Sequence, residues 1–508
     1  MPKAPSGWAS WSEKRREEIL TVDLPGGGDL LCAVFFPADY GIGMANLGIH
    51  YIYRALRELG ASAERFFASP SPFRSVESDT MIERFPLVLG GISYEPDVIT
   101  FAKWLELSGI MASREYRESS PRQRPLIGAG GALTYINPLP LSGICDFIIL
   151  GDGTETVRHL VRVLRGGRSR DETLSTLAEH PSIFVPSLHL TGEHSLAAAK
   201  DDVSGDYGRS TWIVKNGVFK DTLLLELQRG CPNGCRFCAL TGCFSPVRVR
   251  DVELVKRDIE KTLRAAEFSR IGLVTPEAGD YKYIDELLDF AEHKGKGVSF
   301  ASLRVDNLTE RMMKALVSGG SGTVTVAPET GDDRLRNICG KRFGNGDVIE
   351  KLEMAARIGA RSAKLYFMIG LPGETREQVM SISALCGDIR LKTGLAVTAS
   401  ISPFVPKPGT PWAGEAFAGE KKLKVLFSLL SRSLRGVSGV KPRAAGIREA
   451  CVEYAVSRAG TEASRFIARN VLSGISYKKL LQLSDRKETE AELSGLGLAF
   501  PRFMKGGA

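Results

Sequence analysis

The strongest constraint on the fold of this 508-residue chain is an alternation of short apolar runs with amphipathic segments in its second half. Six runs are expected to be strands, at 223–227, 270–274, 297–305, 322–327, 362–369 and 396–401. Segments with helical spacing separate them, at 252–266, 284–293, 310–317, 348–358 and 376–390. Such alternation predicts an α/β fold with parallel strands, here a partial (β/α)6 barrel over residues 222–412.

A second alternation lies nearer the amino end. Strands are expected at 30–36, 62–67, 85–92, 125–131 and 146–150, with helices at 46–59 and 155–164. This order predicts an amino-terminal doubly wound parallel sheet, Rossmann-like, over residues 28–168. Residues 1–27 are interpreted as a lead-in segment and 169–221, which are broken by Pro, Gly and Ser, as a linker. After Trp412 helical spacing dominates, so 413–508 is expected to be a helical carboxyl-terminal region.

The composition favours a cytoplasmic protein that does not enter a membrane. The chain is 43% hydrophobic and 25% charged, and its opening MPKAPSGWASWSEKRREEIL has no apolar core of the length that a secretory signal needs. No later run approaches the roughly 18 apolar residues of a membrane span. Five of the nine cysteines are scattered singly, which is unlike a secreted disulfide framework.

The other four cysteines fall within LQRGCPNGCRFCALTGC, Leu227–Cys243, directly after the first barrel strand. Active sites of such barrels collect at the carboxyl ends of the strands. Cys231, Cys235 and Cys238 form Cys-x3-Cys-x2-Cys, and thiolates spaced in this way on one loop can hold an iron–sulfur cluster. Two alternatives are a zinc knuckle and an electron-transfer cluster completed by Cys243.

The spacing, with Phe237 before the last cysteine, resembles the signature of the radical S-adenosylmethionine (SAM) superfamily. The resemblance implies that Cys231, Cys235 and Cys238 bind a [4Fe–4S] cluster and that SAM chelates its fourth iron. It also implies reductive cleavage of SAM to a 5′-deoxyadenosyl radical, which abstracts hydrogen from a substrate. A flavodoxin-like or ferredoxin-like electron donor is the implied partner.

Further segments resemble the SAM-binding parts of the family. Lys364–Thr375, KLYFMIGLPGET, is similar to the fifth-strand segment along the adenine, which implies contacts from Ile369 and Gly370. Val326–Gly331, VAPETG, resembles the fourth-strand end, which makes Glu329 a ribose or methionine contact, with helix capping as its alternative. The second-strand Gly-Gly-Glu motif is not matched, but Glu277 is expected near the ligand's amino group.

A period of two in VSFASLRVD predicts that Ser302 and Arg304 share a face with Phe300. Arg304 is expected to pair with a carboxylate, either that of the ligand or that of Glu329, and a structural ion pair is its alternative. We expect Cys243 to be a buried thiol near the cluster, with a catalytic thiol as the alternative. The catalytic residues themselves are not identified by any motif.

A doubly wound domain before such a barrel is similar to cobalamin-binding members of the family, over residues 28–412. Those members present Asp-x-His-x-x-Gly, whereas this chain has Asp39-Tyr-Gly-Ile-Gly-Met44. If this chain binds cobalamin, we therefore expect it to bind without the usual His ligand. His50 is expected to be an ordinary helix residue. The segment 45–48 with Gly151-Asp-Gly153 resembles a subgroup of radical SAM proteins without an assigned reaction.

The net charge of +8 is concentrated in residues 421–470, which contain eleven Lys or Arg against three Asp or Glu. Such density suits RNA or another polyanion, although a solvated helix face is favoured because few aromatic residues accompany the cations.

Three functions follow as hypotheses. The first is a radical SAM enzyme acting on an unidentified substrate, with methylation as one outcome. The second is a radical SAM enzyme that modifies RNA or a translation component. The methylthiotransferases are disfavoured, because the first 200 residues hold only Cys32 and Cys145. The third is a non-catalytic iron–sulfur electron-transfer protein, which would need no nucleoside pocket.

Overall fold

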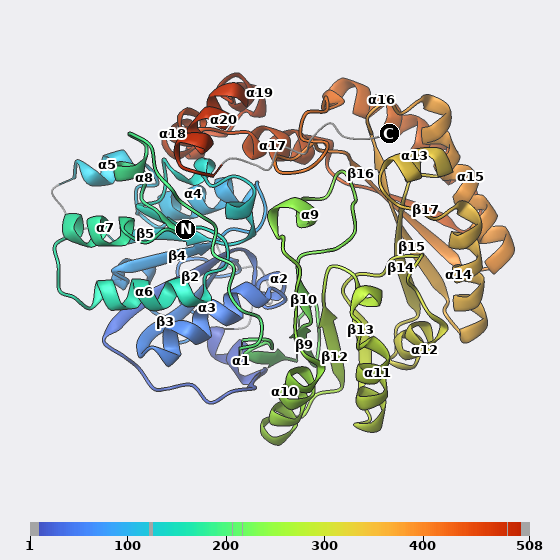
Figure 1. Cartoon of the computed structure of the whole chain (residues 1–508), viewed down its shortest axis with the longest axis horizontal. Helices are drawn as coiled ribbons and strands as arrows, with labels where there is room; N and C mark the ends of the chain where they lie inside the picture. The colour runs from blue at the N-terminus through green and yellow to red at the C-terminus, as the bar shows by residue number, and fades with distance from the viewer. Residues whose placement is uncertain (1–9, 121–124, 206, 216, 485, 499–508) are drawn as a thin grey trace.

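The computed structural model describes residues 10–120, 125–205, 207–215, 217–484 and 486–498. It contains two parallel α/β units side by side, joined by short β-ribbons and by the carboxyl-terminal helices (Figure 1). Within the described residues no helix is both long and apolar enough to cross a bilayer.

The amino-terminal unit is built on a six-stranded sheet in the order β3-β2-β4-β5-β6-β7, counted over the described residues. All neighbours are parallel except β6 and β7. The strands are β2 (Leu30–Asp39), β3 (Ala61–Ser69), β4 (Leu87–Gly91), β5 (Leu126–Gly130), β6 (Phe147–Ile149) and β7 (Ile183–Phe184). The first five follow the doubly wound order that reverses between β2 and β4, where such folds bind ligands.

Helices cover both faces of this sheet, as the apolar strands require. The short α2 (Tyr40–Gly43) follows β2. One apolar core joins the sheet to α3 (Leu47–Glu58), α6 (Thr154–Leu164) and α7 (Arg170–Ala178), and it includes Trp11 of α1 (Trp11–Arg16). The other core joins it to α4 (Asp97–Leu107) and to the carboxyl-terminal helices, while α5 (Arg114–Glu118) lies near its edge.

The lead-in strand β1 (Glu18–Leu20) pairs with β8 (Trp212–Val214). Residues 169–221 therefore contribute α7, β7, α8 (Pro186–His189) and β8 to the unit rather than forming a simple linker.

The second unit is an open barrel of parallel strands in two groups. One sheet has the order β13-β12-β9, with β9 (Thr222–Glu226), β12 (Arg270–Val274) and β13 (Gly297–Phe300). The other has the order β14-β15-β16-β17, with β14 (Thr323–Glu329), β15 (Ser362–Ile369), β16 (Ala396–Pro403) and β17 (Val440–Ala444). A strand is present at each of the six predicted places, although β13 ends at Phe300 rather than at 305, and β17 is one strand more. Because only Val440 of β17 is buried, its apolar pattern is too weak to mark a strand.

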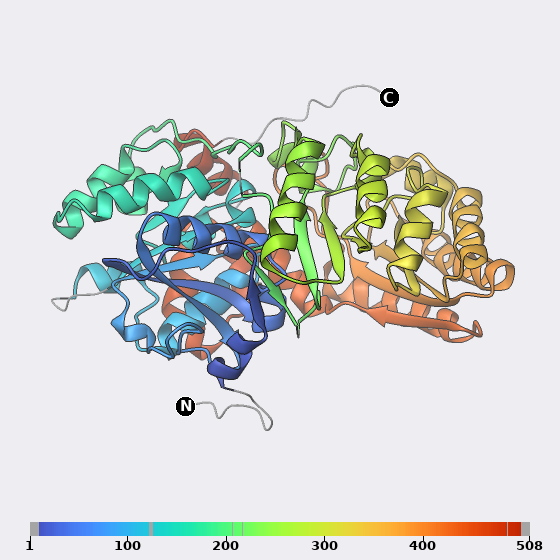
Figure 2. The ribbon, with the colours of Figure 1, turned by 90° about the horizontal axis from the view of Figure 1, so that it is seen from below.

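Helices pack on the outer side of these strands (Figures 1 and 2). They are α10 (Val252–Ala265), α11 (Ile284–His293), α12 (Glu310–Ser318), α13 (Asp333–Ile338), α14 (Asn345–Ile358), α15 (Arg376–Thr393) and α16 (Gly419–Arg435). The carboxyl-terminal region is mainly helical, as predicted, but it is divided between the two units. Helix α16 joins the barrel core. The remaining helices, α17 (Ile447–Ser457), α18 (Thr461–Asn470), α19 (Tyr477–Gln482) and α20 (Arg486–Gly495), supply apolar side chains to the amino-terminal core.

Candidate functional site

The cysteine loop begins at the carboxyl end of β9 and is closed by a short antiparallel ribbon. Strand β10 (Gln228–Arg229) pairs with β11 (Arg248–Val249) on either side of the loop, which contains the short α9 (Ala239–Cys243). Gly230 has φ +79°, and a Cβ there would lie 2.7 Å from the carbonyl oxygen of Phe244. Only glycine fits this position without strain, so the local sequence fixes where the loop starts.

Three cysteines of this loop lie in a polar and partly buried setting. The Arg304 guanidinium donates to the Cys235 sulfur at 3.3 Å, and the Asn233 amide lies 3.5 Å from the Cys231 sulfur. Burial, together with the neighbouring Cys235 and Cys231 thiols, raises the pKa of Cys238 to about 11. The three thiols are thus close enough to repel one another as thiolates, and cationic or amide donors face two of them.

Two contacts with the rest of the barrel hold the loop in place. The Arg236 amide donates to the Cys339 carbonyl at 3.0 Å, and the Trp412 amide donates to the Arg236 carbonyl at 3.1 Å. Phe237 packs in the small apolar cluster that contains Trp412, with ring centroids 6.5 Å apart. Phe237 is therefore an anchor of the loop, beside the thiols.

Glu329 lies at the end of β14 and is buried, with φ +67°. It accepts a hydrogen bond from Lys341 Nζ at 2.6 Å, and the same ammonium donates to the Ala327 carbonyl at 2.6 Å. The cap of α13 is Asp332, whose side chain accepts from the Leu335 amide at 2.7 Å. Helix capping is therefore not the role of Glu329. A left-handed backbone at a non-glycine residue costs free energy and is typical of functional positions.

Glu277 lies in the loop after β12 and is 1% exposed. Its Oε1 accepts from the Gly279 amide at 2.7 Å, whereas Oε2 has no hydrogen-bond partner among the described residues. Burial raises the pKa of Glu277 to about 7, although the Gly279 amide acts in the opposite direction. A buried carboxylate oxygen without a donor is costly, so this position suits a cationic ligand group.

The strand β15 ends in the turn predicted to follow the adenine. Ile369 is fully buried, and Gly370 has φ +81°. A Cβ on Gly370 would meet Ala418 Cβ at 2.9 Å, so the protein's own packing requires glycine here. The Gly370 amide donates to Glu374 Oε2 at 2.6 Å, while Glu374 Oε1 has no partner within the described residues. Burial raises the pKa of Glu374 to about 7.

The expectation for residues 297–305 needs correction. The strand β13 ends at Phe300, because its neighbour β12 stops at Val274 and passes into a loop with Pro276. The period of two therefore does not extend to Ser302 and Arg304. Ser302 instead accepts from the Ala278 amide at 3.3 Å through its backbone carbonyl.

Arg304 was expected to pair with Glu329 or with a ligand carboxylate. It forms a bidentate pair with Asp306, at 3.0 and 2.7 Å, and also contacts Cys235. Glu329 is paired with Lys341 instead. Arg304 is therefore a neighbour of the thiols, and its structural pairing with Asp306 sets its direction.

Cys243 is half-buried, and its sulfur lies 4.0 Å from the Gly409 carbonyl. Burial raises the pKa of Cys243 to about 12, which does not suit a reactive thiolate. Among the described side chains, no group of three or more His, Cys, Asp or Glu could hold a single metal ion.

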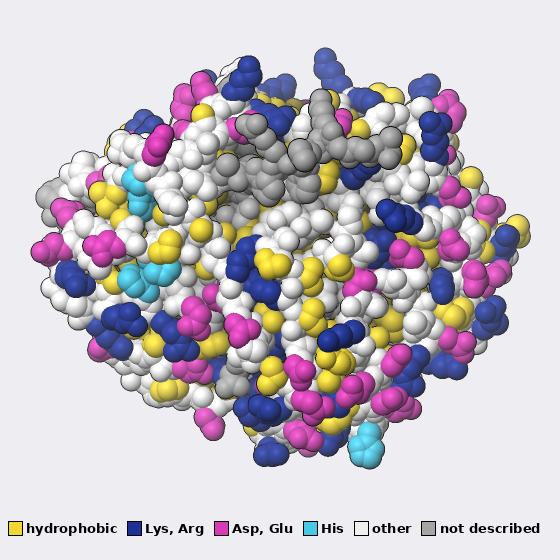
Figure 3. Space-filling model, viewed as in Figure 1, with side chains coloured by type: hydrophobic (Ala, Val, Ile, Leu, Met, Phe, Trp, Pro, Cys, Tyr) yellow, Lys and Arg dark blue, Asp and Glu magenta, His cyan; other side chains and the backbone are white. Residues whose placement is uncertain are grey.

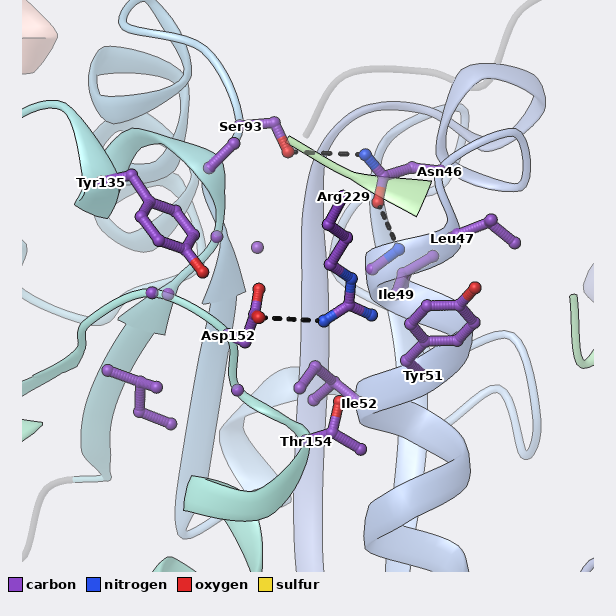
Figure 4. Close-up of a pocket in the computed structure, with 18 of the residues that line it drawn as sticks. Asn46, Leu47, Ile49, Tyr51, Ile52, Ser93, Tyr135, Asp152, Thr154 and Arg229 are labelled. Atoms are coloured by element: carbon purple, nitrogen blue, oxygen red, sulfur yellow. Dashed lines mark hydrogen bonds and ion pairs between the residues drawn. The ribbon is translucent and has the colours of Figure 1, made fainter. Parts of the chain in front are cut away.

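A cavity of about 350 Å³ separates the amino-terminal sheet from the cysteine loop (Figure 4). One wall is formed by the carboxyl ends of β2, β4, β5 and β6, and it is rich in glycine. The opposite wall is formed by Gln228, Arg229, Leu240, Phe244 and Pro276. Arg229 crosses the cavity to Asp152 at 3.1 Å, as Figure 4 shows. No motif predicted this cavity, because its two walls are distant in the sequence.

Two of the cavity glycines leave space, whereas packing requires glycine at Gly90, Gly131 and Gly151, where a Cβ would lie 2.9, 2.5 and 2.4 Å from its nearest neighbour. A Cβ built on Gly91 would lie 3.6 Å from Phe36, and one on Gly130 would lie 3.4 Å from Ile149. Both distances permit a side chain, and both positions line the cavity. The sequence therefore keeps this wall open at the point where doubly wound sheets bind ligands.

His50 is an ordinary helix residue, as expected. It is fully buried, its Nε2 lies 3.0 Å from the Met44 carbonyl, and its Nδ1 accepts from the Thr211 amide at 3.0 Å. Burial lowers the pKa of His50 to about 4. Both ring nitrogens are thus occupied, and no His is among the residues that line the cavity.

The cations of residues 421–470 do not form one surface. Arg458 is buried and donates to the Ala413 carbonyl at 2.6 Å. Arg465 and Arg469 both pair with Glu115. The exposed cations of α16 lie on the barrel side. The face in Figure 3 intersperses both signs of charge. A solvated role is favoured for most of these residues.

Comparisons with known proteins agree with this architecture. Two family models match, "Radical SAM proteins, N-terminal" over residues 48–186 and "Radical SAM superfamily" over residues 225–386. An uncharacterised protein of Methanocaldococcus jannaschii is 25% identical over 472 residues, 89% of this chain and 95% of its own. A probable dual-specificity RNA methyltransferase RlmN of Acidothermus cellulolyticus is 26% identical over 211 residues, 38% of this chain and 48% of its own.

A solved structure shares the fold over most of the chain. It is the cobalamin-dependent S-adenosylmethionine radical enzyme OxsB, with aqua-cobalamin and S-adenosylmethionine bound. The match has a TM-score of 0.51 and 15% identity, and it covers 91% of this chain and 62% of that chain.

Proposed function

Because the chain belongs to the radical S-adenosylmethionine superfamily, we propose that it is a cobalamin-dependent radical enzyme that methylates its substrate. The observation that carries the proposal is the cavity with a glycine-rich wall, which lies between the carboxyl ends of a doubly wound sheet and the cysteine loop. A cofactor in that cavity would adjoin the loop that holds the cluster.

Cys231, Cys235 and Cys238 would hold the [4Fe–4S] cluster. When bound, such a cluster would supply the electron for reductive cleavage of SAM to methionine and the 5′-deoxyadenosyl radical. Arg304 donates to the Cys235 sulfur at 3.3 Å, and Asn233 lies 3.5 Å from that of Cys231. These donors orient the ligand thiolates and lessen their negative charge. The donor set fits a cluster with one iron left for SAM.

Residues around the loop would hold SAM. Glu277 offers a buried carboxylate oxygen without a donor, which suits the ammonium group of the methionine part. Glu329, held by Lys341, would accept from the ribose or the ammonium. Ile369 and Gly370 would lie along the adenine, with the turn fixed by Glu374. Ser302 and Phe237 would border the same site.

We infer that this cavity would receive cobalamin in a form without a protein His ligand, which agrees with the absence of His from its described lining residues. Gly91 and Gly130 leave room for a broad planar group, and Asn46 and Ser93 offer polar atoms beside them. Bound cobalamin supplies methyl-transfer chemistry. The chain's own contribution is to exclude water with apolar side chains such as Leu240 and Phe244 and to limit the cofactor's movement.

RNA modification is a second candidate, favoured by the partial match to RlmN. It requires a path for RNA along the cations of α16, which are exposed. Binding of an oligonucleotide that falls steeply with salt would support it. A non-catalytic electron-transfer role is not proposed, because the chain is a radical SAM enzyme.

The cysteine assignment is tested by single substitutions. After anaerobic reconstitution, the protein should bind about four irons and release 5′-deoxyadenosine from SAM when reduced. Cys235→Ala should lose both the cluster absorbance and the nucleoside, because one ligand is missing. Cys243→Ala is the matched control and should keep both, since its thiol is outside the triad. Iron loss in the control, or a normal cluster in a Cys231, Cys235 and Cys238 triple alanine variant, would reject the assignment.

A further inference from the structure

The sheet β14-β15-β16-β17 carries three cations, Lys364, Lys441 and Arg443, on its inner face. Residues that point outward from these strands, such as Val326, Leu365 and Ala399, are buried in the core beneath the helices. Successive side chains alternate between the faces of a strand, so the residues between them point inward. Helices α14 and α15 lie on the outer side, and β9 and β12 lie beyond the inner side (Figure 1).

The strand register arranges the inner residues in two rows. Lys364 of β15 is opposite Thr398 of β16, which is opposite Lys441 of β17. In the next row Tyr366 is opposite Ser400, which is opposite Arg443. Strands lie about 4.8 Å apart, so Lys364 and Lys441 are separated by about 10 Å, and Arg443 is about 7 Å along the strand from Lys441. Three cations and three hydroxyl groups therefore share one patch, which we call the inner patch.

Two of these cations have no acidic partner. Lys441 and Arg443 are exposed, and neither makes a side-chain hydrogen bond or an ion pair with any described residue. Lys364 donates to the Tyr366 hydroxyl at 2.7 Å. The single carboxylate within these four strands, Glu329, lies past the register shift of β14 and is paired with Lys341. The inner patch thus keeps its positive charge.

The inner patch is also open to solvent. Tyr366 is 39% exposed although it points into the barrel, so other side chains do not fill the space in front of it. A surface lined by one sign of charge concentrates ions of the opposite sign. Repulsion among like charges on neighbouring strands is unfavourable unless an anion offsets it.

We propose that the inner patch binds the phosphoryl group of a phosphorylated small-molecule substrate. A phosphate carries close to two negative charges and three acceptor oxygens, which match an arginine fork, two ammonium groups and the hydroxyls of Thr398 and Ser400. Tyr366 lies four residues before Gly370, about 13 Å below the edge where SAM is proposed to bind. The phosphate would thus anchor one end of the substrate, and the other end would extend toward the cluster. This inference rests on the proposed function, which supplies the reaction.

Calorimetry with inorganic pyrophosphate on the reconstituted protein tests the proposal. The double substitution Lys441→Gln, Arg443→Gln should weaken pyrophosphate binding at least tenfold, because two of the three cations are removed. The control Lys421→Gln, Arg435→Gln removes two exposed cations from α16 and should leave binding unchanged. Because all four side chains are exposed, neither change should unfold the protein.

The reductive formation of 5′-deoxyadenosine is measured in parallel, since it reports the radical chemistry without the substrate. The amount of 5′-deoxyadenosine should be equal in the wild type and in both double variants. If the proposed radical chemistry is wrong, the nucleoside assay fails while calorimetry is unaffected. The inference would be overturned if the wild type does not bind pyrophosphate. It would also be overturned if the α16 control weakens pyrophosphate binding as much as Lys441→Gln, Arg443→Gln does. Citrate binding as tightly as pyrophosphate would overturn the choice of phosphate. An oligonucleotide that binds at the inner patch and resists displacement by pyrophosphate would replace the small molecule with a nucleic acid.

Discussion

At the scale of single residues, the spacing of the cysteines was the most informative signal in the sequence. The resemblance also pointed to Glu329, which lies near the Cys235 and Cys238 thiols, and to Glu277, which lies near Arg304. The resemblance does not predict which residues these two carboxylates contact. Lys341 contacts Glu329 from a loop twelve positions later in the chain, and Glu329 itself has a left-handed backbone. Sequence periodicity contains no information about such a turn. For Arg304 a structural ion pair was one of the two expected roles, but its partner, Asp306, was not identified.

Glu329→Gln should weaken SAM binding by roughly 1.5–3 kcal/mol, the range for a hydrogen bond to a charged group. The amide keeps the shape of the side chain but removes the charge that a ribose hydroxyl or ammonium would meet. Calorimetry on the reconstituted protein measures the dissociation constant, with cluster content as a check. Asp332→Asn, at the cap of α13, is the control and should not alter SAM binding. An unchanged constant for Glu329→Gln would remove this residue from the SAM site.

At the scale of elements, the alternation of apolar runs located most strands and helices because each run is buried as a unit. The pattern failed where burial is partial. Strand β17 has one buried residue, Val440, and lies at a sheet edge, so its sequence does not differ from that of a loop. Strand β13 ended early because its neighbour turned away after Val274, which is a property of the neighbour's backbone. In both cases the neighbouring strand, and not the intrinsic strand preference of the residues, determined where the strand forms or ends.

The turn that follows β15 gives a prediction about pH. The pKa of Glu374 is raised by burial to about 7, above its usual value of 4.5. The folded state therefore binds a proton that the unfolded state releases, so stability falls as the pH rises from about 4.5 to 7. Glu374→Gln cannot ionise and keeps an acceptor for the Gly370 amide. Between pH 5 and pH 8 the wild type should lose about 1–3 kcal/mol more stability than the variant.

Anaerobic urea unfolding at the two pH values measures this difference. Glu377→Gln is the control, because Glu377 lies in the same helix start and is fully exposed. It should follow the wild type. Parallel pH profiles for the wild type and Glu374→Gln would show that Glu374 ionises normally in the folded protein.

At the scale of the whole molecule, the sequence predicted two α/β units but not how they meet. The carboxyl-terminal helices α17 to α20 return to the amino-terminal core, and Lys407 joins Glu95 of one unit to Glu453 of α17 at 2.9 Å each. The cavity exists because this arrangement brings the sheet edge to the cysteine loop. Tertiary packing over such sequence distances leaves no local pattern, which is why only the cobalamin resemblance suggested a ligand there.

The cobalamin site is tested by the amount of cobalamin that the reconstituted protein retains. Hydroxocobalamin is added anaerobically, excess is removed by gel filtration, and corrinoid and iron are quantified. Gly91→Leu would place a side chain in the cavity without backbone strain, whereas Gly26→Leu adds the same side chain at an open site elsewhere. We predict about one corrinoid per chain for the wild type and for Gly26→Leu, and less than about a tenth for Gly91→Leu, with equal iron in all three. No retention by the wild type, or equal retention by Gly91→Leu, would contradict a cobalamin site between the sheet and the cysteine loop.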